Sequence, residues 1–260
     1  MKLTLTGTAS GIPVAGRRHS AALLEADGSM LLLDAGEGVS TALLEAALPS
    51  EALTAVCITH THADHVSGLP MLLQGLHLTG RLSPLDILVP TGREDWFRAW
   101  LTGMYIFPEK WSFPVRLHPL EETRFANGAL RLLPIPNRHL ERVRDLAAQH
   151  GIPAQCFSLR FEHGDSSLLV SSDIAGIADV ATHAGRSDVL VVDATHVPLT
   201  EITALADTYP SLRIVCTHIP PELESDLLRL ASELESAYGA RIRFAYDGMY
   251  IELEREKAWK

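Results

Sequence analysis

One segment constrains this chain more than any other, because four side chains that can bind a metal lie within six residues. They follow a predicted buried strand, Leu53–Ile58, a short apolar run rich in β-branched residues. The four are His60, His62, Asp64 and His65. Residues two apart on an extended chain project to the same side, so His60 and His62 can reach one ion together. Imidazole and carboxylate groups bind zinc and similar ions, so the segment predicts a metal site at a strand end.

The rest of the chain is organised as strands followed by helices, and this order occurs twice. In the first half we predict strands at Lys2–Thr6, Ser20–Glu25, Ser29–Asp34, Ile87–Val89, Val115–Leu117 and Leu130–Leu133, with helices at Val39–Ala47 and Val66–Gly75. In the second half we predict strands at Phe157–Phe161, Ser167–Ser171, Val189–Asp193 and Arg213–Thr217, with helices at Ile174–His183, Thr200–Asp207 and Glu222–Tyr238. A last hairpin is predicted from Phe244–Tyr246 and Met249–Glu252, with its turn at Asp247-Gly248. Two sheets packed face to face with helices outside them, an α/β fold, would satisfy this order.

Composition narrows the class of protein. The chain has 260 residues, 47% of them hydrophobic and 21% charged, which is ordinary for a globular protein and excludes a disordered one. Linkers and low-complexity tracts are absent, so we expect residues 1–260 to form a single domain. The net charge of −10 argues against a general nucleic-acid coat or a basic membrane-surface protein. With three cysteines, no leader-like start and no apolar run long enough to span a membrane, we expect a cytoplasmic protein.

The pattern His-x-His-x-Asp-His at a strand end resembles the signature of the metallo-β-lactamase superfamily of metal-dependent hydrolases. Within that superfamily three segments resemble the ribonuclease Z branch: Gly7–Pro13 with Arg17 and Ser20 after it, Leu33–Gly38, and Asp247–Met249. The resemblance implies a four-layer αββα sandwich, in which two mixed sheets lie face to face between outer helices. It is also the sole ground for expecting a homodimer.

The resemblance further implies a ligand set for two divalent ions. His60, His62 and His139 match the first metal site, Asp64, His65 and His218 match the second, and Asp173 matches the bridging carboxylate. His139, Asp173 and His218 each follow a predicted strand; taken singly, each has an ordinary alternative as a loop histidine, a helix N-cap or a core histidine. Asp34 matches an aspartate that supports the metal loop by accepting a ligand histidine's free N–H. We expect zinc, while manganese and iron also suit these ligands.

The chain departs from the ribonuclease Z pattern in three places. Val192 stands where that branch has a histidine tied to phosphodiester cleavage, so His196 is either a substitute acid or an ordinary loop residue. His19 is a second candidate at the site rim, in a loop that lacks the branch's lysine. Only 33 residues separate His139 from Asp173, so the short insert Leu140–Cys156 replaces the long arm expected for transfer RNA.

Seven aromatic residues gather within residues 93–113 of a chain that is only 6% aromatic. They are Trp96, Phe97, Trp100, Tyr105, Phe107, Trp111 and Phe113. This aromatic cluster has two interpretations: core packing or a dimer surface, or a hydrophobic wall over the metal site that selects a partly apolar substrate.

These residues predict a dinuclear metal-dependent hydrolase. The first interpretation is a phosphodiesterase acting on a small, anionic phosphodiester, in which a hydroxide shared by both ions attacks, Asp64 orients it and His196 protonates the leaving group. The alternatives are a hydrolase of thioesters, lactones or carboxylic esters, a ribonuclease Z that lacks the usual arm, and a metal-binding protein without catalysis. The net charge and the missing arm argue against a nucleic-acid partner without excluding one.

Overall fold

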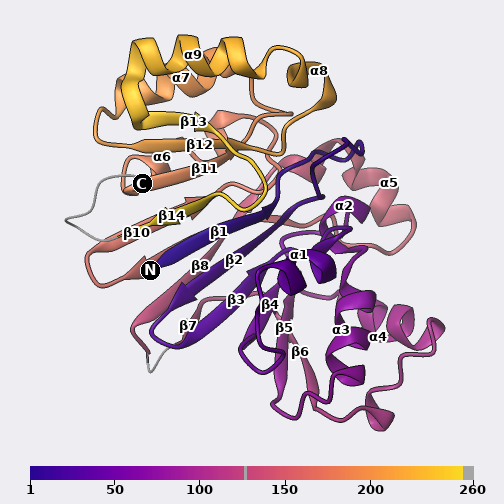
Figure 1. Cartoon of the computed structure of the whole chain (residues 1–260). Coiled ribbons are helices and arrows are strands. Elements are labelled where there is room, and N and C mark those ends of the chain that lie inside the picture. Colours follow the sequence, from indigo (N-terminus) through magenta and orange to yellow (C-terminus); the bar gives the residue numbers. More distant parts are fainter. Residues whose placement is uncertain (126–127, 254–260) are drawn as a thin grey trace.

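The structure is a computed structural model that describes residues 1–125 and 128–253. Within these ranges the chain forms two seven-stranded sheets. The first runs in the order β14-β1-β2-β3-β4-β5-β6 and the second in the order β13-β12-β11-β10-β9-β8-β7. Figure 1 shows the first sheet formed mainly by the N-terminal half of the chain and the second by the C-terminal half.

The strands of the first sheet are β1 (Lys2–Gly7), β2 (Ala21–Ala26), β3 (Ser29–Leu33), β4 (Ala55–Cys57), β5 (Leu85–Val89), β6 (Val115–Pro119) and β14 (Tyr250–Glu252). Those of the second sheet are β7 (Thr123–Phe125), β8 (Leu130–Asn137), β9 (Cys156–His163), β10 (Ser166–Val170), β11 (Val189–Asp193), β12 (Arg213–Thr217) and β13 (Ile242–Phe244). Both sheets are mixed: for example, β2 pairs antiparallel with β3, whereas β3 pairs parallel with β4.

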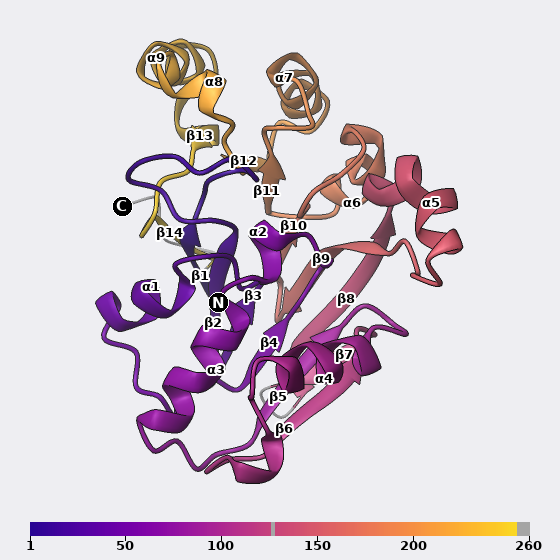
Figure 2. The same cartoon turned by 90° about the vertical axis from the view of Figure 1, so that its right-hand side faces the viewer.

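The helices are α1 (Val39–Glu45), α2 (Ala63–Val66), α3 (Leu69–Leu78), α4 (Glu94–Gly103), α5 (Arg144–Gln149), α6 (Ala181–Ala184), α7 (Leu199–Thr208), α8 (Pro221–Glu224) and α9 (Leu227–Tyr238). Short 3₁₀ turns lie at η1 (Pro108–Lys110), η3 (His139–Val143), η4 (Ile177–Asp179) and η5 (Gly239–Arg241). Turned by 90°, the molecule shows α1, α3 and α4 outside the first sheet and α6, α7 and α9 outside the second (Figure 2). This is the predicted αββα sandwich.

Alternation along the strands builds the layers. In β3, Leu31 and Leu33 belong to the core between the sheets, while Leu32 between them packs outward with α1 and α3. In β11, Val191 faces the core between the sheets and Val192 faces the outer core beside α7. Side chains of a strand alternate between its faces, so a strand buried on both sides reads as a continuous apolar run. Full burial of one leucine or valine side chain contributes roughly 1.5–3 kcal/mol to the free energy of folding.

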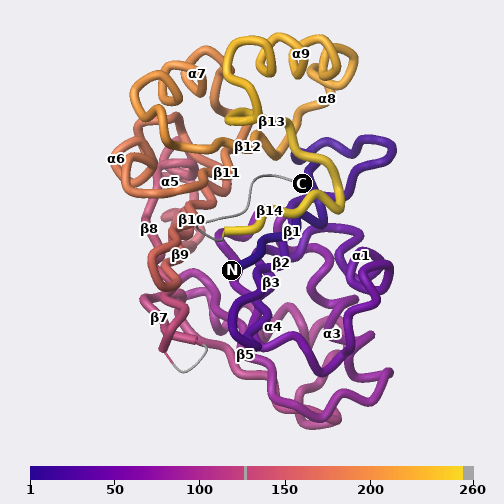
Figure 3. The backbone as a smooth tube through the Cα atoms, turned by 60° about the vertical axis from the view of Figure 1, so that its left-hand side comes forward, coloured from indigo at the N-terminus to yellow at the C-terminus, as the bar shows by residue number. Residues whose placement is uncertain are grey.

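The last predicted hairpin is wrong. β13 pairs with β12 in the second sheet, whereas β14 pairs with β1 in the first, so the Asp247-Gly248 turn crosses between the sheets. Figure 3 shows β14 alongside β1, near the start of the chain. The Asp247 carboxylate accepts hydrogen bonds from Thr8 Oγ1 and the Arg18 backbone N–H, and these contacts hold the turn at the crossing.

Two predicted helices are also broken. The range Ile174–His183 contains η4 and the start of α6 and no longer helix. Its first backbone N–H groups are taken by side-chain carboxylates, because Ile174 N–H donates to Asp193 and Ala175 N–H donates to Asp179. The range Glu222–Tyr238 divides into α8 and α9 at Ser225 and Asp226, residue types that favour helix ends over helix interiors. No helix in the described ranges is both long and apolar enough to cross a membrane.

Candidate metal centre

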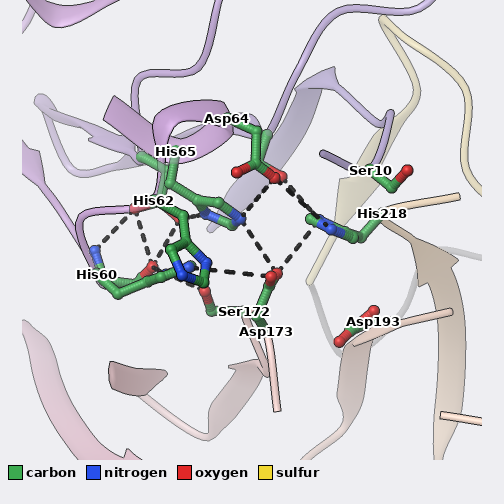
Figure 4. Close-up of polar contacts among 12 residues, drawn as sticks. Ser10, His60, His62, Asp64, His65, Ser172, Asp173, Asp193 and His218 are labelled. Atoms are coloured by element: carbon green, nitrogen blue, oxygen red, sulfur yellow. Dashed lines mark hydrogen bonds and ion pairs between the residues drawn. The ribbon is translucent and has the colours of Figure 1, made fainter. Parts of the chain in front are cut away.

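The predicted metal ligands come together where several strands end. They are His60 and His62 after β4, Asp64 and His65 in α2, His139 after β8, Asp173 after β10, and His218 after β12. In Figure 4, the side chains of His60, His62, Asp64, His65, Asp173 and His218 point toward a common centre. The structure therefore brings all seven predicted residues into one place.

The backbone turns sharply at three of these strand ends. Asp34 after β3, Ser172 after β10 and His218 after β12 have φ angles of 57°, 51° and 54°. Positive φ is uncommon for residues other than glycine and clusters at functional sites, where surrounding contacts hold it. Here it reverses the chain at the strand end, so that neighbouring side chains can face the centre.

The first group of ligand atoms comes from His60, His62, His139 and Asp173, and all lie within 4.8 Å of one another. His139 Nε2 is 3.2 Å from His62 Nδ1 and 3.6 Å from Asp173 Oδ2. Burial lowers the pKa of His60 and His62, and it lowers the pKa of His139 to about 4. These rings are therefore neutral at pH 7, which leaves a nitrogen lone pair for a metal ion.

The second group comes from Asp64, His65, His218 and Asp173, again with ligand atoms within 4.8 Å of one another. Asp173 Oδ1 lies 3.1 Å from His65 Nε2 and 3.2 Å from His218 Nδ1. Burial acts to lower the pKa of His65, but the carboxylates of Asp173 and Asp34 outweigh it and raise that pKa well above its usual value. The distances to Asp173 in the two groups show that its Oδ2 faces the first group and its Oδ1 faces the second.

Three buried atoms in this centre lack a hydrogen-bond partner: His60 Nε2, His65 Nε2 and Asp173 Oδ1. Unpaired buried polar atoms are costly and are normally satisfied by protein, water or an ion. Histidine nitrogens and carboxylate oxygens are the donors that zinc and similar divalent ions use. The described residues thus suit a dinuclear site, with Asp173 shared between two ions.

Asp34 supports the centre as predicted. Its Oδ2 accepts a hydrogen bond from His65 Nδ1 at 2.8 Å, which leaves His65 Nε2 facing the ligand groups. The same carboxylate accepts from the Thr59 backbone N–H at 2.8 Å and from Thr59 Oγ1 at 2.8 Å. Asp34 therefore holds both the Thr59 backbone, directly before His60, and the orientation of the His65 ring.

His196 lies at the edge of the centre and has a partner, Asp193, that the sequence motifs do not single out. Its Nδ1 is 2.7 Å from Asp193 Oδ2, and its ring centroid is 4.9 Å from that of His139. The hydrogen bond to Asp193 raises the pKa of His196. Asp193, three residues before His196 and last in β11, could have been found from that spacing at a strand end.

Two other sequence candidates contribute no atom to the two ligand groups. The His19 ring is buried and contacts the Ser10 carbonyl oxygen at 2.8 Å, so it takes part in the packing of the N-terminal loop. In the aromatic cluster, Phe97 and Phe113 are fully buried in the outer core of the first sheet. Trp100 packs against that core, which favours core packing over a wall at the metal centre.

Comparison with known proteins agrees with this geometry. The sequence model of the family described as Anti-Pycsar protein Apyc1 matches residues 1–195. A ribonuclease Z of Pseudomonas putida is 41% identical over 124 residues, covering 47% of this chain and 38% of that protein. A ribonuclease Z of Shouchella clausii is 37% identical over 171 residues, covering 65% and 51%. The chain thus spans about half or less of these curated relatives.

Solved structures share the fold at low identity. The metallo-β-lactamase fold protein YhfI from Bacillus subtilis superposes with a TM-score of 0.72 at 20% identity, covering 96% of this chain and 98% of that one. Human tRNase Z, short form, gives 0.71 at 20% identity, covering 98% and 100%. A diphosphatase of the PhnP family gives 0.70 at 20% identity, covering 97% and 98%. With its fold, ligand motif and sequence match taken together, this chain belongs to the Anti-Pycsar protein Apyc1 family, in the ribonuclease Z-like branch of the metallo-β-lactamase superfamily.

Proposed function

We propose that this protein is a metal-dependent phosphodiesterase that hydrolyses a small anionic phosphodiester. The observation that carries the proposal is Asp173, a buried carboxylate whose two oxygens face two separate groups of histidine and aspartate. Two ions held a short distance apart suit an in-line displacement at phosphorus, because the attacking and leaving oxygens both need charge stabilisation.

One ion would be held by His60, His62 and His139. The other ion would be held by Asp64, His65 and His218. Asp173 would contact both ions. When bound, divalent ions of this kind supply Lewis acidity and lower the pKa of water toward neutrality. Zinc is the ion we propose, and manganese and iron suit the same ligands.

Two further side chains have proposed roles in the reaction. Asp64 lies 3.5 Å from His65 Nε2 and 3.7 Å from His218 Nε2, so its carboxylate can orient the attacking water beside those rings. His196 is partly exposed at the edge of the centre, and its bond to Asp193 favours the protonated ring. We assign it the transfer of a proton to the leaving oxygen.

The segment between His139 and β9 favours a small substrate. This insert contains only η3 and α5, with no arm of its own. The chain also carries a net charge of −10, which disfavours a long polyanion across its surface. The curated relatives are named ribonuclease Z, so processing of transfer RNA is the second candidate.

The test is a substrate screen on zinc-loaded protein. The substrates are bis(p-nitrophenyl) phosphate, a thioester, a lactone and a precursor transfer RNA. We expect turnover of the phosphodiester, and its loss together with loss of bound metal in His62→Ala. Preferred cleavage of the thioester or lactone would overturn the proposal in favour of an ester hydrolase, and preferred cleavage of the precursor would support a ribonuclease Z.

A further inference from the structure

A cavity of about 390 Å³ opens beside the first ligand group. His62, His139 and His196 line the side near the proposed metals. Leu140, Arg142 and Val143 of η3, the short turn that begins with His139, line the cavity as well. The cavity therefore links the proposed reaction centre to a segment in which this chain lacks the ribonuclease Z arm.

The η3 wall presents apolar and cationic side chains together. Leu140 and Val143 line the cavity, and Val143 is 45% exposed, so its side chain is accessible to a molecule bound there. Arg142 lines it as well. In a 3₁₀ turn, side chains three residues apart eclipse one another, so Arg142 lies on the same side as His139, about 6 Å further along the axis.

The two arginines of this cavity differ in their partners. Arg138 Nε donates to Asp179 Oδ1 at 2.6 Å, and its backbone N–H donates to the same carboxylate, so its charge is already compensated. Arg142 makes no hydrogen bond or ion pair with any residue in the described part of the chain. The Arg142 guanidinium is therefore an uncompensated positive charge on the cavity wall, and it can bind an anion that enters the cavity.

We propose that Arg142 binds a second anionic group of the substrate, distinct from the phosphodiester that is cleaved. This inference rests on the proposed function and names its substrate class: a phosphodiester whose organic part carries a further phosphate or carboxylate. The organic part lies against Leu140 and Val143, and the second anion reaches Arg142 at the outer wall. The single negative charge of the phosphodiester would be compensated by the bound metal ions, so Arg142 would remain available for a second anionic group.

Two chromogenic substrates distinguish binding of the second anionic group from cleavage of the phosphodiester. One is the p-nitrophenyl ester of thymidine 5′-phosphate, and the other is the same compound with an added 3′-phosphate. Arg142→Gln removes the charge at the wall. Arg144→Gln is the matched control, because Arg144 lies outside the cavity lining and pairs with Glu141 at 3.4 Å.

We expect the wild-type protein to have the lower KM for the doubly charged substrate. In Arg142→Gln the ratio of the two KM values should shift by about tenfold against that substrate, as loss of a charged hydrogen bond predicts. Arg144→Gln should keep the wild-type ratio. If both substrates are cleaved and the ratio is the same in Arg142→Gln, this inference is overturned while the phosphodiesterase assignment stands. If the wild-type protein cleaves neither substrate, the phosphodiesterase assignment fails and this inference fails with it.

Discussion

Replacement of Asp34 with alanine removes the carboxylate that holds the metal-binding segment in place. Asp34 is buried, and it accepts hydrogen bonds from the Thr59 backbone N–H, from Thr59 Oγ1 and from His65 Nδ1. The Thr59 hydroxyl has another partner in Ser172 Oγ at 2.7 Å. The Thr59 N–H and the His65 ring N–H are left without an acceptor.

The cost comes from these two donors. A buried donor left unpaired costs about 1–3 kcal/mol, so the pair predicts a loss of about 2–6 kcal/mol in the free energy of unfolding. A cavity of about 50 Å³ is lined by Asp34, Thr59 and His65, and it has room for a water molecule that could accept one of these bonds. With one donor satisfied by that water, we expect a loss of about 1–3 kcal/mol. Zinc affinity should fall about 10–100-fold, because the His65 ring loses the bond that orients it.

Urea denaturation of metal-free protein measures the first effect, and zinc competition with a chromophoric chelator measures the second. Asp34→Asn should fall between wild type and Asp34→Ala, because an amide keeps one acceptor oxygen. Asp95→Ala, at an exposed position in α4, is the control and should change neither quantity appreciably. The reasoning is refuted if Asp34→Ala unfolds at the wild-type urea concentration and binds zinc with wild-type affinity.

Two further predictions concern the packing and the protonation of the centre. In Gly36→Ala the added Cβ would lie 2.3 Å from the Asp64 carbonyl oxygen, so we expect the free energy of unfolding, measured by urea denaturation, to fall by about 1–3 kcal/mol. The control is Gly103→Ala, which adds its Cβ in open space and should unfold near the wild-type midpoint. Equal stability of the two variants would contradict the close approach at Gly36. The pKa of His196 is raised in the folded protein by Asp193, so the stability this pair adds is present below about pH 6.5 and is lost as pH rises through the raised value. In metal-free protein, wild type should therefore exceed His196→Ala in stability by more at pH 6 than at pH 9, and an equal difference at both pH values would count against this ion pair.

The part of the site that sequence could predict is the part that is local. His60, His62, Asp64 and His65 follow one buried strand, so their density and spacing indicate a metal site without other information. Asp173 and His218 are single residues at distant strand ends, and only the resemblance to a family drew them into the same prediction. Both follow strands of the second sheet, and they meet the His60–His65 segment because the two sheets pack face to face, which no local pattern encodes.

The errors have the same origin. An Asp-Gly turn between two apolar runs is typical of a hairpin, and the turn at Asp247-Gly248 does form. Which sheet each flanking strand joins depends on distant contacts with β1 and β12. Helix α4 is absent from the predicted elements because its aromatic residues read as a cluster, although Phe97, Trp100 and Leu101 have helical spacing. The role we propose for Arg142 depends on which charges have partners, and that is a property of the fold.

The central claim is that two metal ions, held by the residues around Asp173, cleave a phosphodiester. Metal-free protein titrated with zinc, with hydrolysis of bis(p-nitrophenyl) phosphate measured at each step, tests it most directly. We predict no turnover without metal, a maximum at two zinc ions per chain, and neither turnover nor two-ion binding in Asp173→Asn. Full turnover in metal-free protein, or binding of two ions with no phosphodiester cleavage, would contradict the claim.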